Sequence, residues 1–135
     1  MSIWDALRKK RKILIVDDDR DFAASLAAVI SSYKNAKLYD TDISYDATGA
    51  LKIVKQNPPE LIILDINLPD INGFRLCRTL RDEIGYQGKI LMLTVRSEID
   101  DIKRGEGAGA DGYIQKPVSN DSLLQALDEL FARKN

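Results

Sequence analysis

The stretch LIILDINLPDINGF, residues 61–74, contains the signals from which the fold can be deduced. It opens with four apolar residues, Leu61 to Leu64, as expected of a strand buried on both faces of a parallel sheet. The run stops at a carboxylate, Asp65, and turn-forming residues follow, namely Pro69, Asp70, Asn72 and Gly73. We therefore expect Asp65 on a loop at a strand's end. Taken alone, the pattern also fits a carboxylate that only caps a neighbouring segment.

Three other short apolar segments also end at polar residues. They are Ile13 to Val16 before Asp17, Asp18 and Asp19, Ile90 to Leu93 before Thr94, and Tyr113 with Ile114 before Lys116. A fifth, more polar strand is expected near Asp42 to Tyr45, where partial alternation is typical of a sheet edge.

Apolar residues at helical spacing predict a helix after each strand. The ranges are about Arg20 to Tyr33, Asp46 to Asn57, Phe74 to Ile84, Ser97 to Glu106, and Ser119 or Asn120 to Phe131. Gly105 and Gly107 weaken the fourth helix, which we expect to be the most mobile. Strict alternation of strand and helix predicts a doubly wound α/β domain with a mostly parallel sheet. Ligands of such folds bind beyond the carboxyl ends of the strands.

Composition indicates one soluble domain. The chain has 135 residues, 44% of them hydrophobic, and a net charge of −1, which predicts no long-range attraction to nucleic acid. We expect a cytoplasmic protein, because no apolar run is long enough to span a bilayer and the N-terminus lacks the features of a signal peptide. The chain has no histidine, and its single cysteine, Cys77, falls on an apolar helix face and is expected in the core.

Residues 1–11 are expected to form an extension, and residues 12–135 the domain. Ser2 to Leu7 could form a short helix, and five cations follow, Arg8 to Lys12. This segment is either a solvated tail or a docking element for a partner, a second subunit or an anionic membrane surface.

Polar groups from four strands converge on one edge of the predicted sheet. Asp17, Asp18 and Asp65 would repel one another there unless a cation joined them, and their oxygen ligands suit Mg²⁺. Lys116 adds a positive charge and Thr94 a hydroxyl donor, so the site is suited to an incoming dianion. This arrangement favours phosphoryl transfer, in which Asp65 attacks phosphorus while the other groups neutralise the oxygens.

The sequence resembles the receiver domain of two-component response regulators. The resemblance covers roughly residues 12–133 and rests on ILIVDDD at residues 13–19, LIILDINLPDINGF around Asp65, ILMLT ending at Thr94, and GADGYIQKP ending at Pro117. It implies a (βα)5 flavodoxin-like three-layer sandwich with a five-stranded parallel sheet in the order 2-1-3-4-5. It also implies a cis peptide between Lys116 and Pro117.

The resemblance assigns roles to individual residues. It makes Asp65 the phosphoacceptor, and it gives Mg²⁺ as ligands Asp18, Asp65 and the carbonyl of Asn67, with Asp17 acting mainly through metal-bound water. Lys116 pairs with the acidic site. In the same way it makes Thr94 the switching hydroxyl and Tyr113 the aromatic that turns inward when Thr94 moves.

The function implied is a phosphorylation switch rather than an enzyme, with only self-directed phosphotransfer and slow autodephosphorylation. A histidine kinase or phosphotransfer protein would supply the phosphoryl group. The switch would change contacts with an unknown protein target, or within a homodimer, through the face formed by the helix predicted at 97–106, the fifth strand and the last helix. No direct binding of nucleic acid and no membrane span is expected.

Two features depart from the family pattern. Val95 is larger than the usual residue after the switch threonine, so it should narrow access to the site. Gly105, Gly107 and Gly109 should loosen the fourth helix. Asn67 and Arg96 occupy positions that modulate the phosphoryl lifetime in the family.

Three other functions remain alternatives. A receiver that binds constitutively without phosphorylation finds its only support in Val95. A haloacid-dehalogenase-like phosphohydrolase would need a second aspartate where this chain has Asn67. A flavodoxin-like FMN protein shares the fold class, but the acidic residues would repel the flavin phosphate.

Overall fold

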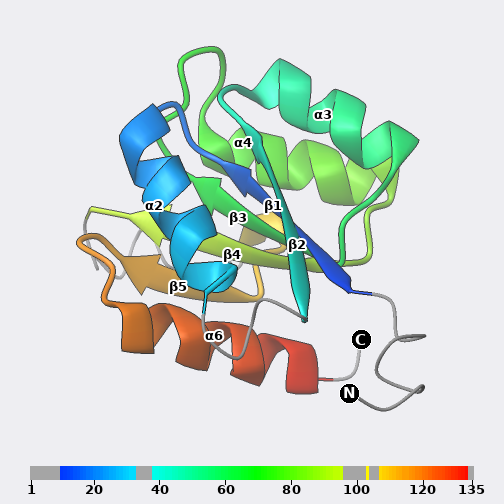
Figure 1. The fold of residues 1–135 in the computed structure, drawn as a ribbon. Helices are drawn as coiled ribbons and strands as arrows, with labels where there is room; N and C mark the ends of the chain where they lie inside the picture. Colours follow the sequence, from blue (N-terminus) through cyan, green and yellow to red (C-terminus); the bar gives the residue numbers. More distant parts are fainter. Residues whose placement is uncertain (1–9, 33–37, 96–102, 104–106, 134–135) are drawn as a thin grey trace.

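The computed structural model describes residues 10–32, 38–95, 103 and 107–133. A five-stranded parallel sheet runs through its centre in the order β2-β1-β3-β4-β5, which confirms the expected doubly wound topology. The strands are β1 (Arg11–Val16), β2 (Tyr39–Ser44), β3 (Leu61–Asp65), β4 (Lys89–Thr94) and β5 (Gly112–Gln115). The helical segments are α2 (Arg20–Ile30), α3 (Ala47–Gln56), α4 (Gly73–Arg78), η2 (Thr79–Ile84) and α6 (Asn120–Ala132). Helices α2 and α6 cover one face of the sheet, and α3 and α4 cover the other (Figure 1).

Two apolar clusters form the core, one on each face of the sheet. In β3, Ile62 and Leu64 belong to the cluster under α3 and α4, whereas Leu61 and Ile63 belong to the cluster under α2 and α6. All five residues of β3 are buried. Successive side chains of a strand point to opposite faces, and this explains why a strand covered on both sides has an uninterrupted apolar run.

Cys77 is fully buried in the cluster under α3 and α4, as expected. Burial raises the pKa of its thiol to about 11. The thiol is therefore protonated at neutral pH and packs as an apolar group.

Some boundaries differ from the prediction. The edge strand β2 begins at Tyr39 rather than near Asp42, because Tyr39 pairs with Arg11 and stacks on Phe131 of α6 with ring centroids 5.6 Å apart. Helix α2 ends at Ile30, before the predicted limit at Tyr33. The predicted helix 74–84 is α-helical only to Arg78, and it continues with the wider π-type turns of η2 to Gly85, whose φ of 77° closes it.

Two predicted segments cannot be compared with the structure. The extension 1–9 lies outside the described residues, and so does the helix predicted at 97–106, apart from position 103. In the described part of the chain, no helix has the length and apolar character needed to cross a membrane.

The guanidinium of Arg81 holds the segment that precedes β5. Arg81 donates to the carbonyl oxygens of Tyr86, Gly88 and Gly109, and it forms an ion pair with Asp111 at 2.8 Å. Arginine suits such a position because its planar fork presents several donors in a fixed geometry. These contacts connect η2 to the residues that precede β5, and Lys116 directly follows β5.

The loop after Asp65 is held by backbone contacts. The Gly73 N–H donates to the Ile66 carbonyl at 2.6 Å, and the Asn72 side chain caps α4 by accepting from the Phe74 N–H at 2.8 Å. A β-carbon built at Gly73 would collide with the carbonyl of Asp65. Glycine is therefore required where this loop returns against the end of β3.

Asp70 joins the same loop to α3. Its carboxylate accepts from the backbone N–H groups of Ala47 and Thr48 and from the Thr48 hydroxyl, each at 3.0 Å. Desolvation of the carboxyl would raise its pKa, but these hydrogen bonds prevail and lower the pKa to about 2. Helix α3 thus has two acidic caps, since Asp46 also accepts from the Gly49 N–H at 2.7 Å.

We expect Asp70→Ala to lower the free energy of unfolding at neutral pH by roughly 1 kcal/mol, the usual value of a helix cap. Because the folded-state pKa lies below the ordinary value of 3.8, this contribution is complete at neutral pH. It disappears as the pH falls from about 4 towards 2. Urea denaturation from pH 7 down to pH 3 measures the change. Asp40→Ala, an exposed aspartate of β2, is the control; equal losses in the two variants would contradict the capping role of Asp70.

We expect Gly73→Ala to destabilise the fold by roughly 1–3 kcal/mol, because the added methyl displaces the backbone at Asp65. Gly107→Ala is the matched control, since a β-carbon there meets no atom within 4 Å. Thermal unfolding of both variants tests the expectation, and an unchanged melting temperature for Gly73→Ala would refute it.

Candidate functional site

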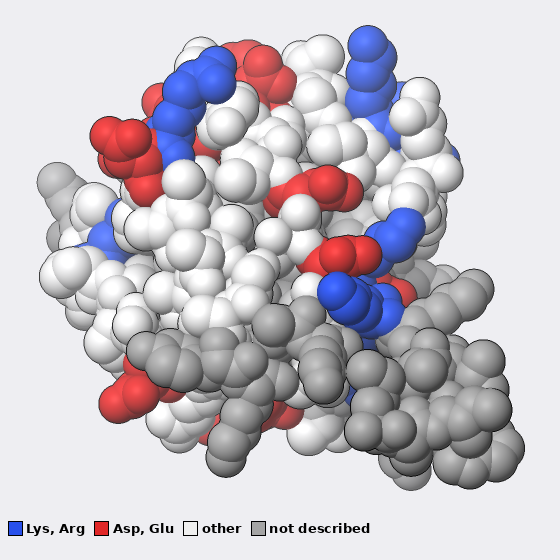
Figure 2. Space-filling model, viewed as in Figure 1, with Lys and Arg blue, Asp and Glu red and all other residues white. Residues whose placement is uncertain are grey.

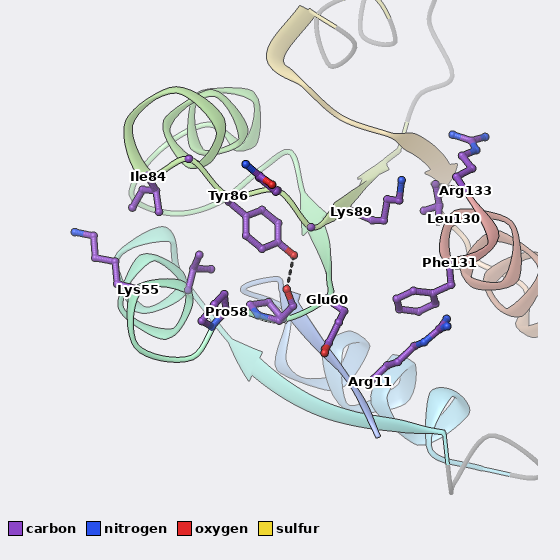
Figure 3. A pocket seen from close by; sticks show the side chains of 15 residues that line it. Arg11, Lys55, Pro58, Glu60, Ile84, Tyr86, Lys89, Leu130, Phe131 and Arg133 are labelled. Carbon is purple, nitrogen blue, oxygen red and sulfur yellow. Dashed lines mark hydrogen bonds between the residues drawn. The ribbon is translucent and has the colours of Figure 1, made fainter. Parts of the chain in front are cut away.

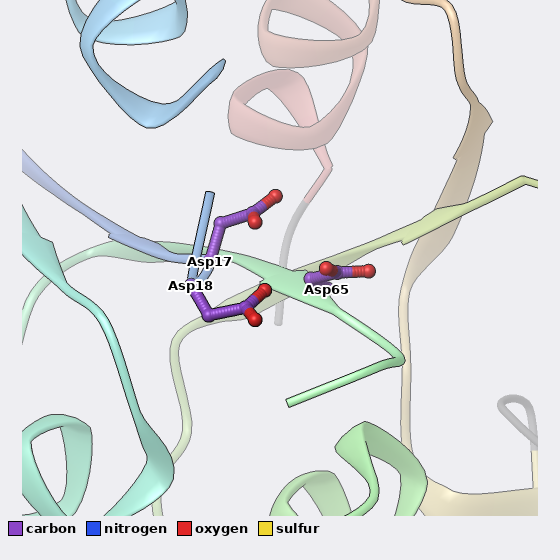
Figure 4. Close-up of side chains that lie close together, drawn as sticks. All are labelled: Asp17, Asp18 and Asp65. Carbon is purple, nitrogen blue, oxygen red and sulfur yellow. The ribbon is translucent and has the colours of Figure 1, made fainter. Parts of the chain in front are cut away.

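Three carboxylates meet at the carboxyl edge of the sheet. The pairing of Val16 with Leu64 sets the ends of β1 and β3 at the same level, so Asp17 and Asp18 lie beside Asp65 (Figure 4). One oxygen from each of the three carboxylates lies within 4.8 Å of the others. The convergence expected of these three side chains is therefore present.

Two of the carboxylates are removed from water. Asp17 is fully buried and Asp65 is 6% exposed, whereas Asp18 is exposed. Burial raises the pKa of Asp65, and the neighbouring Asp17 raises it further. Lys116 and the hydrogen bond from the Asn67 N–H, at 3.3 Å, act in the opposite direction. The site thus concentrates negative charge where water screens it poorly.

Lys116 supplies the cation that faces this charge. Its Nζ lies 3.0 Å from an oxygen of Asp17 and 3.4 Å from an oxygen of Asp65. Burial alone would lower the pKa of Lys116, but the two aspartates raise it, so the ammonium stays charged. Its backbone N–H donates to the Thr94 carbonyl at 2.7 Å, and the following peptide to Pro117 is cis, as expected.

An aromatic ring completes the surroundings of Lys116. The ammonium lies 4.3 Å from the ring centroid of Phe22, in the first turn of α2. Such a cation–π contact attracts a lysine to a fixed position. The role of Phe22 was not predicted, because helical spacing identifies it only as an apolar residue facing the core. The sequence feature that could have indicated this role is the position of Phe22, one helical turn after the acidic residues 17–19.

Backbone donors hold the loop between β1 and α2. One oxygen of Asp17 accepts from the Asp19 N–H at 3.0 Å, and the Asp19 side chain caps α2 by accepting from the Phe22 N–H at 3.1 Å. Asp17 therefore uses one oxygen for the loop and the other for Lys116. Its position is defined by hydrogen bonds on both sides.

The residues assigned to the switch lie nearby in the sheet. Thr94 ends β4 and is 5% exposed, and Tyr113 of β5 is half-buried and packs against the cluster under α3 and α4. Val95 follows Thr94 and is 57% exposed, and its effect on access stays a prediction. Arg96 falls outside the described residues.

The acidic group fits a hard divalent cation. It offers only oxygen donors, and in the described part of the chain Lys116 is the one side-chain cation paired with Asp17 and Asp65. Three carboxylates against one ammonium leave an excess of negative charge. Oxygen ligands and residual charge are what Mg²⁺ requires.

Comparisons with known proteins identify the family. The sequence model of the response regulator receiver domain matches residues 13–128. The chain is 38% identical over 115 residues to the DNA-binding response regulator MtrA of Mycolicibacterium paratuberculosis, covering 85% of this chain and 48% of MtrA. It thus spans about half the length of such curated relatives.

Solved structures of response regulators have the same fold as this chain. A two-component response regulator from Clostridium difficile superposes with a TM-score of 0.83 at 28% identity, over 93% of this chain and 99% of that one. The chemotaxis protein CheY4 of Vibrio cholerae gives a TM-score of 0.82 at 26% identity, over 90% and 99% of the two chains. Sequence, fold and site geometry lead to the same conclusion, that this chain belongs to the response regulator receiver domain family.

Proposed function

We propose that this protein is a signalling switch that accepts a phosphoryl group on Asp65. The observation that carries the proposal is the contact of Lys116 with both Asp17 and Asp65, at 3.0 and 3.4 Å, beside a third carboxylate. A lysine on the surface could not offset the charge of these buried carboxylates, because water would screen it. Here Lys116 is held against the carboxylate that would react, where it can also meet an incoming phosphoryl oxygen.

The chemistry follows from the position of these groups. An oxygen of Asp65 attacks phosphorus in line with the leaving group of the donor, an acyl phosphate forms, and the leaving group departs with the electrons of the broken bond. Lys116 neutralises charge on the equatorial oxygens, and Thr94 donates its hydroxyl to one of them. The ring of Phe22 limits where the ammonium can move.

Asp17, Asp18, Asp65 and the backbone carbonyl of Asn67 would hold Mg²⁺. The ion, when bound, would offset the charge of the carboxylates and of the phosphoryl group. The gathering of the three carboxylates supports this ligand set. Asp17, fully buried and already hydrogen-bonded through both oxygens, is best suited to act through metal-bound water.

The phosphoryl group would come from a histidine kinase or a phosphotransfer protein. Its oxygens would draw Thr94 towards Asp65, and Tyr113 would then turn inward. The face that includes β5 and α6 would change its contacts with a protein target or a second copy of the chain. We take residues 12–135 as the receiver domain and residues 1–11 as its extension.

Direct contact with nucleic acid is not proposed for this chain. MtrA is a DNA-binding regulator, but the chain matches only 48% of its length. On the face seen in Figure 2, the described acidic and basic side chains lie interspersed among neutral ones. Proteins that bind nucleic acid usually gather lysine and arginine on one surface.

Incubation with Mg²⁺ and acetyl phosphate should add one phosphoryl group to the native protein, as measured by intact mass. Asp65→Ala should add none. Asp121→Ala, an exposed aspartate in the first turn of α6, should behave as the native protein. Absence of uptake by the native protein would overturn the proposal, and uptake by Asp65→Ala would move the acceptor to another residue.

Phe22→Leu should slow phosphoryl uptake from acetyl phosphate by about two- to fivefold, which corresponds to a cation–π contribution of roughly 0.5–1 kcal/mol. The loss is limited because Asp17 and Asp65 still hold Lys116. Phe22→Tyr keeps the ring and should retain the native rate. Equal rates in Phe22→Leu and the native protein would show that the ring does not position the lysine.

A further inference from the structure

A hollow lies at the opposite end of the sheet from Asp65. Its walls include Arg11 and Lys89, the first residues of β1 and β4, the loop after α3, and the end of α6. It has a volume of about 840 Å³. Nothing in the phosphorylation chemistry uses this end of the sheet.

The charge around the hollow is strongly one-sided. Its lining includes four basic residues, Arg11, Lys55, Lys89 and Arg133, and one acidic residue, Glu60. Four positive charges and one negative charge give a local balance of +3, whereas the whole chain carries −1. A concave surface lined by one sign of charge attracts ligands of the other sign.

Lys89 is the most informative of these residues. It is 7% exposed, and in the described part of the chain its ammonium has neither a hydrogen-bond partner nor a carboxylate within salt-bridge distance. No fully buried side-chain nitrogen in that part of the chain lacks a partner, so the ammonium must reach solvent at the hollow. A bound anion would supply the counter-charge that the described residues do not provide there.

Two guanidinium groups nearby form no ion pair with a carboxylate of the described residues. Arg11 lies over the ring of Phe131, with its Cζ 4.5 Å from the ring centroid. Arg133 donates to the Asp111 carbonyl at 2.9 Å, which leaves its other N–H groups available. Both are held in place before any ligand arrives, so less conformational entropy would be lost on binding.

Most of the remaining lining residues are apolar, and Gln87 is the polar exception. Phe131 lies between Leu130 and Arg11 on one side of the hollow, and Tyr86 lies on the other side, where its hydroxyl donates to the Pro59 carbonyl at 2.8 Å (Figure 3). This hydrogen bond directs the polar end of Tyr86 to the backbone and leaves its ring as part of the wall. A bare inorganic ion would leave these surfaces unused.

We propose that this hollow binds a small organic anion. Its acidic group lies among Lys89, Arg11 and Arg133, and its apolar body packs against the part of Phe131 that Tyr39 and Arg11 leave uncovered. The site is separate from Asp65, and the inference does not depend on the phosphorylation proposed above. An acidic peptide is a different occupant, and the experiment below distinguishes it.

The probe is 2-naphthoate, titrated into the 135-residue chain while backbone amide resonances are followed by NMR. We expect saturable shifts concentrated at residues 84–89 and 130–133. The neutral analogue 2-naphthamide should bind at least tenfold more weakly. Added salt should weaken naphthoate binding, because its attraction is electrostatic. Shifts concentrated elsewhere, equal affinity for the two probes, or no saturable binding would each overturn the proposal.

Variants test the role of the cations. Lys89→Met keeps the length of the side chain without its charge and should weaken naphthoate binding at least fivefold. Arg133→Gln, at an exposed position, should also weaken it and serves if Lys89→Met folds poorly. Lys52→Met, on the exposed side of α3, should leave affinity unchanged. Native affinity in both Lys89→Met and Arg133→Gln would overturn the site, and tighter binding of a glutamate-rich peptide than of naphthoate would replace the small ligand with an acidic segment.

Discussion

Three carboxylates repel one another at one edge of the sheet, and the neighbouring loops and Lys116 hold them together there. Asp17 and Asp65 are buried, and the fold places them together although their charges oppose one another. Lys116 supplies the opposite charge, although it lies 99 residues after Asp17 in the chain. Such a site retains an excess of negative charge, and this excess favours the binding of a cation.

The surrounding structure serves to hold these groups in place. The β1–α2 loop is fixed by Asp19, the loop after Asp65 by Asn72 and Gly73, and the approach to Lys116 by Arg81. Each device uses a hydrogen bond to a backbone group, so the geometry of the site is set by the main chain. The apolar strands between the helices provide the rigid support from which these loops extend.

The two ends of the sheet differ in chemistry. The carboxyl end gathers acids around one lysine, and the amino end gathers cations around one glutamate. In a parallel sheet every strand contributes its first residue to one end and its last residue to the other. Separate sites can therefore form without sharing a residue. Lys89 and Thr94 open and close the same strand, β4, and belong to different ends.

The amino-acid sequence predicted the strands, the parallel topology and the acidic site, because an apolar run that stops at a polar residue indicates both a buried strand and the place where it ends. It could not locate the start of β2, which Tyr39 sets through contacts with Arg11 and Phe131. Nor could it find the ring of Phe22 beside Lys116, or Asp70 at the start of α3. Those contacts join residues that are distant in the chain. Which side chains meet there depends on three-dimensional packing, because a burial pattern shows which face of an element is covered but not which residue covers it.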